Sequence, residues 1–83
     1  MRLRGSGLTW QEIDGELVIL DLNRSVYLTT NGSGTVLAKL LVEERTADEL
    51  AAALVQTYSI DTDTARRDVE SFIKTLTDKG LLA

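Results

Sequence analysis

The stretch LVILDLNRSVYLTTNGSGTVLAKLL, residues 17–41, decides the fold because its apolar period changes partway along. From residue 16 to residue 22 the apolar side chains alternate between the two faces of an extended chain. One face carries Val18, Leu20 and Leu22, and the other carries Leu17 and Ile19. A strand that is apolar on both faces is central in a sheet or covered on both sides. A turn at residues 23–25 then leads to a short third strand, Val26 to Thr29, and the period becomes helical.

Upstream of this stretch, the sequence predicts a hairpin. Leu8 to Ile13 forms a first strand, and Asp14-Gly15 joins it to the second, because both residue types tolerate the positive φ of a two-residue turn. Residues 1–7 are expected to be a loose arm. We therefore expect a single domain over residues 8–83, preceded by a flexible arm.

Three helices are predicted after the strands, and the first two are recognised by their caps and apolar positions. Thr30 or Asn31 is placed to cap the first, whose apolar positions are Val36, Leu37, Leu40 and Leu41. Thr46 and Glu49 form a capping box that opens the second helix. The apolar stripe of that helix comprises Ala47, Leu50, Ala51, Leu54, Val55 and Tyr58.

A third helix begins at Asp61, Thr62 or Asp63 and ends at Gly80, the usual residue for a left-handed helix terminus. Its apolar stripe comprises Ala65, Val69, Phe72, Ile73 and Leu76. Leu81 and Leu82 are able to fold back as a hydrophobic latch. The predicted class is α+β, a three-stranded antiparallel sheet followed by three helices, the last two arranged as a helix-turn-helix.

Composition excludes several classes of function. The chain has no His and no Cys, which removes zinc fingers, disulfides, thiol catalysis and His-based acid–base chemistry. Its net charge of −4 argues against a nucleic-acid partner. No apolar run approaches the ~20 residues of a membrane span or follows the N-terminal arginines as a signal peptide does. We expect a cytoplasmic protein with no membrane partner.

Two short motifs resemble ligand sites but lack necessary residues. Asp61 and Asp63 could begin a calcium loop, yet its sixth and twelfth positions hold Arg66 and Phe72 in place of Gly and Glu. The NGSG stretch, residues 31–34, lies between a strand and a helix but lacks the Lys-Ser/Thr ending of a phosphate-binding loop. We expect helix capping and a turn here, with no metal, no cofactor and no catalytic residue.

The third helix could also be a DNA recognition helix. It offers Arg66, Arg67, Lys74 and Lys79, but Asp68, Glu70 and Asp78 are interleaved with them and would meet phosphates. No strand follows this helix to act as a wing. A small DNA-binding winged helix therefore stays an alternative, and we expect no nucleic acid.

The short strand from Val26 to Thr29 is the other candidate site. It contains no Lys, Pro or bulge signal, the usual means of blunting an exposed edge. A peptide could add to it as a further strand. It could equally be an ordinary strand hidden by the third helix, or an edge that mediates dimers.

The pattern from about Glu16 to Leu82 resembles the PqqD-like family, the recognition elements that bind leader peptides of ribosomally made natural products. The matching pieces are residues 17–41, RTADELAAALVQTYSID, and DVESFIKTLTDKGLL. The glycine-rich NGSG departs from relatives and puts the first turn of the first helix in doubt. The resemblance implies a winged helix-turn-helix-like domain and a leader lying antiparallel beside the third strand. The implied binding residues are Val26, Tyr27, Leu28 and Thr29 on the strand, with Asp68, Val69, Phe72 and Ile73 on the third helix.

The resemblance also implies partners and no enzymatic activity. Free-standing members look most like lasso-peptide recognition proteins, which deliver a precursor to two enzymes. Those enzymes are a transglutaminase-like leader peptidase and a macrolactam-forming cyclase similar to asparagine synthetase. The alternative within the family is a partner of a radical-SAM enzyme.

Overall fold

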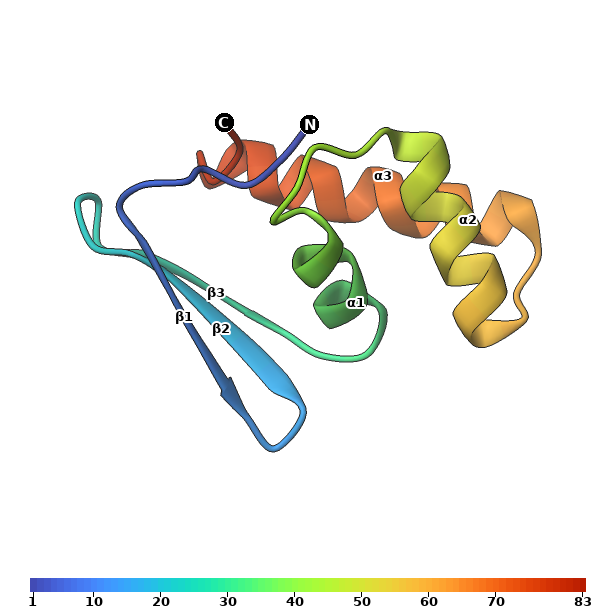
Figure 1. Cartoon of the computed structure of the whole chain (residues 1–83), viewed down its shortest axis with the longest axis horizontal. Helices are drawn as coiled ribbons and strands as arrows, with labels where there is room; N and C mark the ends of the chain where they lie inside the picture. Colours follow the sequence, from blue (N-terminus) through green and yellow to red (C-terminus); the bar gives the residue numbers. More distant parts are fainter.

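The computed structural model describes all residues, 1–83, as three strands followed by three helices. The sheet has the order β1-β2-β3, with both pairs antiparallel, so the strand that is apolar on both faces is the central one. In Figure 1 the helices all lie on one side of this sheet, and α1 lies between the sheet and α3. The elements are β1 Leu8–Ile13, β2 Glu16–Asp21, β3 Val26–Thr30, α1 Ser33–Leu40, α2 Ala47–Tyr58 and α3 Thr62–Asp78. The expected α+β class and element order are confirmed.

The β1–β2 hairpin closes at the predicted turn. Asp14 and Gly15 both have positive φ, 52° and 81°, as a two-residue turn between twisted strands requires. On β2, Leu17, Ile19 and Asp21 face the helices and are buried. The hairpin thereby turns one face of β2 toward the core and leaves the other face without a helix over it.

The start of α1 differs from the expected cap. Gly32 is the N-cap residue, with φ of 52°, and no side chain caps the helix. Thr30 is buried, and its hydroxyl is satisfied there by donating to Leu17 O at 3.4 Å and by sharing a hydrogen bond with the Thr35 hydroxyl at 3.0 Å. Capping by Thr30 or Asn31 was thus a wrong prediction: tertiary contacts use the Thr30 hydroxyl, and glycine supplies the turn.

The caps of α2 and α3 are confirmed. Thr46 Oγ1 accepts from the Glu49 amide at 3.1 Å, and the Glu49 carboxylate accepts from the Thr46 amide at 2.9 Å. Asp61 caps α3 by accepting from the Thr64 amide at 2.6 Å. Ser59, in the left-handed conformation, ends α2 and turns the chain into α3, so that the two helices pack against each other as expected.

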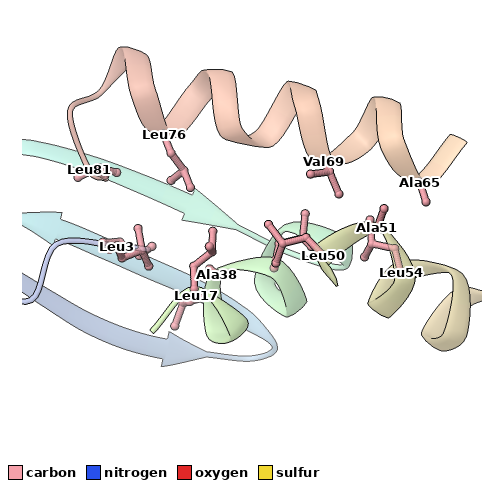
Figure 2. Close-up of a cluster of buried hydrophobic side chains, with 13 residues drawn as sticks. Leu3, Leu17, Ala38, Leu50, Ala51, Leu54, Ala65, Val69, Leu76 and Leu81 are labelled. Atoms are coloured by element: carbon pink, nitrogen blue, oxygen red, sulfur yellow. The ribbon is translucent and has the colours of Figure 1, made fainter. Parts of the chain in front are cut away.

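The hydrophobic core joins both layers of the fold. Figure 2 shows Ala65, Val69 and Leu76 pointing from α3 toward the buried leucines and alanines of the other elements. The core residues are Leu3, Leu17, Ile19, Leu37, Ala38, Leu41, Leu50, Ala51, Leu54, Ala65, Val69, Leu76 and Leu81. No helix has the length and apolar character needed to cross a membrane.

The N-terminal residues are packed, unlike the loose arm expected from the sequence. Leu3 is 3% exposed and forms a β-bridge with Leu82. Its amide donates to Leu41 O at 2.9 Å, and the Ala83 amide donates to Arg2 O at 2.8 Å. The predicted C-terminal latch is confirmed, since Leu81 is fully buried after Gly80, which has a φ of 68°. This latch supplies the partner that holds the N-terminus in place.

Candidate functional site

The free edge of β3 is the first component of the site. Only β2 pairs with β3, through a register that places Leu28 opposite Ile19 and Tyr27 opposite Leu20. The other edge of β3 has no strand beside it. Backbone N–H and C=O groups along such an edge are available to a further strand.

The side chains of β3 alternate between two environments. Val26 and Leu28 lie on the side of the sheet that faces the helices, because Leu28 is opposite the fully buried Ile19. Tyr27 and Thr29 lie on the opposite side, and Tyr27 is 63% exposed. A chain added to this edge would therefore place successive side chains in two different surroundings.

A groove runs along β3. Its volume is about 560 Å³, and it is lined by residues 25–29 together with Lys79 at the end of α3. The groove thus joins the strand to the C-terminal end of the long helix.

A second hollow of about 280 Å³ lies where α1 begins beside α3. Phe72 is half-buried in its lining, and Gly34 permits the close approach of that ring. A Cβ on Gly34 would lie 3.3 Å from Thr30 Cβ and 3.5 Å from Phe72 Cε1. The glycine of the NGSG stretch therefore has a packing role: it brings Phe72 against the start of α1. The lining residues are Ser33, Gly34, Leu37, Asp68, Ser71, Phe72 and Thr75.

The structure places the implied site residues in two neighbouring hollows, Val26 to Thr29 along β3 and Asp68 and Phe72 beside the start of α1, and it corrects one of them. Asp68 is exposed, and Phe72 and Ile73 are partly buried against the core. Val69 is only 1% exposed and belongs to the core itself. It supports α3 from beneath, and its side chain is not accessible to a peptide.

Sequence reasoning missed Lys79, Ser71 and Thr75, which also line the two hollows. A spacing signal was present, because positions 68, 72, 75 and 79 fall on one face of a helix. That face is rotated away from the one carrying Val69 and Leu76, which are buried. The residues predicted from the sequence include Asp68 and Phe72 of this face, together with Val69 of the buried face.

A buried carboxylate fixes the turn that precedes β3. Asp21 is 1% exposed and pairs with Arg4. Its Oδ1 accepts from the amides of Asn23 and Arg24 at 3.1 and 3.3 Å. Burial alone would raise the pKa of Asp21, but the hydrogen bond from Arg4, those two amides and the Arg4 charge together hold that pKa below its ordinary value. Asp21 therefore stays ionised and orders the loop that aims the chain into β3.

The other carboxylates with lowered pKa values are helix caps. The amide of Thr46 lowers the pKa of Glu49, and the amide of Thr64 lowers that of Asp61. No group of three His, Cys, Asp or Glu residues is placed to hold a metal ion. Asp61 has a capping role, and Asp63 lies in the first turn of the helix that it caps.

A further cavity of about 510 Å³ lies between α2 and α3 and shares no lining residue with the hollows at β3. Its lining residues are Asp48, Ala51, Ala52, Val55, Gln56, Thr62 and Arg66. Asp48 and Arg66 form an ion pair of 3.7 Å there. This cavity belongs to the helix-turn-helix and not to the strand edge.

Known proteins share this fold. Residues 16–82 match the family described as "Coenzyme PQQ synthesis protein D (PqqD)". A similar solved structure is "TbiB1 in Complex with the TbiA(beta) Leader Peptide", 30% identical with a TM-score of 0.87, covering 99% of this chain and 94% of that chain. Another is "Lasso peptide synthetase B1 complexed with the leader peptide", 22% identical with a TM-score of 0.82, covering 96% and 93%. A search of curated proteins returned no match. Since the family match spans most of the sequence, this chain belongs to the PqqD family.

Proposed function

We propose that this protein binds the leader peptide of a ribosomally made precursor by strand addition to β3. One observation carries the proposal: β3 is an unpaired edge bordered by a groove that ends at α3. A protein that shares the fold at 30% identity was solved with a leader peptide. The expected peptide-binding residues are Val26, Tyr27, Leu28 and Thr29 with Asp68, Phe72, Ile73 and Lys79.

The backbone edge of β3 and the side chains around it contribute to binding in different ways. Backbone hydrogen bonds along β3 supply affinity that does not depend on the peptide's sequence. Side chains on the helix side of the added strand reach Leu28 and the half-buried Phe72 and supply specificity. Those on the other side meet Tyr27, which is largely exposed and contributes less.

The proposal extends to the role of the bound complex. We infer that the protein presents a lasso-peptide precursor, in the cytoplasm, to a transglutaminase-like leader peptidase and an asparagine-synthetase-like cyclase. A leader held at one edge strand leaves the rest of the precursor free to enter an enzyme. The groove offers backbone groups, apolar side chains and hydroxyls, and we propose a binding role for it with no catalytic step.

The basic residues of α3 support peptide binding over DNA binding. Lys74 pairs with Asp78 at 3.0 Å, and Arg66 pairs with Asp48 at 3.7 Å. Phosphate contacts need cations free to replace counterions. Two of the four basic side chains that α3 would offer to DNA are thus already paired with acids.

The direct test is amide hydrogen exchange on the full chain. The probes are the TbiA(beta) leader peptide and the strongest binders selected from a displayed library of random dodecapeptides. We expect the amides of residues 26–30 to gain protection when peptide is added. The β1 edge is an internal control, because it belongs to the same sheet and should gain none. Protection confined to β1 or to α2 would refute the proposal.

A further inference from the structure

Opposite charges lie near the two ends of β3. At one end Lys79 lines the groove with residues 25–29. The Arg24 side chain lies against Gly80 at that end, where a Cβ on the glycine would collide with the guanidinium. Near the other end of β3, Thr30 and Phe72 both lie close to Gly34. Asp68 lines the hollow there with Phe72, and a neighbouring hollow with Ser33, Tyr58 and Ile60.

These groove charges have no partners within the protein. No carboxylate lies within 4.0 Å of Lys79 or Arg24, and no cation lies within that distance of Asp68. By contrast, Lys74 and Asp78 on the same helix neutralise each other. The charges that border the groove are therefore free to pair with a ligand.

The distance between the two ends suits a short extended segment. At ~1.5 Å per residue, the helical stretch from Asp68 to Lys79 is about 16 Å long. About five residues of extended chain span that distance. Since β3 itself has five residues, the charged ends lie near the two limits of the strand.

We propose that these charges make the groove directional and select leaders with a basic residue on one side of the strand segment and an acidic residue on the other. This inference rests on the proposed function. β3 runs from the Lys79 end toward the Asp68 end, because Arg24 before it lies against Gly80 and Thr30 at its end lies near Phe72. A peptide that continues the antiparallel sheet enters at Asp68 and leaves at Lys79. The preferred peptide therefore carries Lys or Arg N-terminal to the paired segment and Asp or Glu about five residues later.

The test exchanges the charges on both partners. A peptide selected from the random dodecapeptide library on the parent protein is made in two forms, one as selected and one with its basic and acidic residues exchanged. Affinities are measured by fluorescence polarisation for the parent protein and for the double variant Asp68→Lys/Lys79→Glu. The matched control is Asp48→Arg/Arg66→Asp, which exchanges the charges of an ion pair outside the groove.

We expect the parent and the control to prefer the selected form by about fivefold, the scale of two exposed ion pairs. The groove variant should prefer the exchanged form. Both preferences should vanish near 1 M salt, where the screening length is about 3 Å. If the parent and the groove variant rank the two peptides alike, or if selected peptides show no charge asymmetry, the groove is not directional. If Leu28→Asp binds the selected peptides as the parent does, the peptides bind elsewhere and the proposed function falls too.

Discussion

The two edge strands of the sheet, β1 and β3, differ in how open they are to pairing with a further strand. β1 carries Glu12 on the helix side of the sheet, where its carboxylate pairs with Lys39 of α1 at 2.7 Å. β3 carries no charged residue and lines a groove of about 560 Å³. An inward-facing charge is one way in which proteins make an edge unfit for a further strand. The comparison indicates that the chain protects one edge and keeps the other open for use.

The largest expected effect distinguishes the two edges at matched positions. Leu28 on β3 and Trp10 on β1 both lie opposite Ile19 and are both half-buried. Leu28→Asp should weaken peptide binding at least about a hundredfold, because it replaces the apolar side chain on the helix side of β3 with a carboxylate that apolar peptide side chains would have to desolvate. Trp10→Asp should lower stability but leave the affinity of the folded protein nearly unchanged. Polarisation titrations below each variant's melting temperature make the measurement, and equal losses of affinity would mean that the edges do not differ.

Phe72 lines the hollow at the start of α1 and packs against the core, so its loss should appear in two measurements. A buried Phe→Ala change costs about 3–5 kcal/mol, and a half-buried ring should cost about 2 kcal/mol. A chain of this length has a total stability of about 4–12 kcal/mol. Urea unfolding should show that loss, and peptide affinity should fall with it. If affinity falls while the unfolding midpoint is unchanged, the ring contacts the peptide and does not stabilise the core.

Asp21 makes the two edges differ in their response to pH, because it orders the turn leading into β3 and residues 1–7 before β1 contain no carboxylate. Its pKa in the folded protein is lowered from an ordinary value of 3.8. The stability it contributes is therefore present above that value and is lost as pH falls through the folded pKa. Asp21→Asn should be less stable than the parent at neutral pH and should lack this part of the acid loss. Thermal melts of both proteins from pH 7 down to about pH 2 test it, and parallel pH profiles would contradict it.

The smallest effect is expected at the protected edge. Glu12→Gln removes an exposed ion pair with Lys39, which is worth about 0 to 1 kcal/mol. Unfolding free energy and peptide affinity at β3 should hardly change. The variant should, however, self-associate more than the parent in sedimentation at high protein concentration, because its β1 edge has lost the inward charge. Parent-like sedimentation would mean that Glu12 does not guard this edge.

Much of the fold followed from local patterns in the sequence. The alternation in β2, the Asp14-Gly15 turn and the Thr46–Glu49 capping box each involve neighbouring residues, and the structure confirms them. The prediction failed where distant residues decide the outcome. Leu3 is an isolated apolar residue with no period, and its burial depends on Leu82 at the other end of the chain.

The candidate site was likewise predictable where neighbouring residues decide its structure, and not where tertiary packing decides it. The edge position of β3 was anticipated from its length and composition and is confirmed by the strand order. The accessible face of α3 was anticipated only in part, because Val69 and Phe72 are both apolar and only packing reveals that Val69 is enclosed. Lys79 was considered only as a DNA contact, although its spacing from Asp68 placed it on the groove side of the helix.

The alternation along β3 also sets how freely a cognate leader could change during evolution. Only every second residue of an added strand faces the helices, while its neighbours lie on the side of exposed Tyr27. Substitutions at those neighbouring positions would be nearly silent for recognition. A precursor family served by this protein should therefore conserve a sparse, every-other-residue signature, and leaders with low overall identity could share one recognition protein.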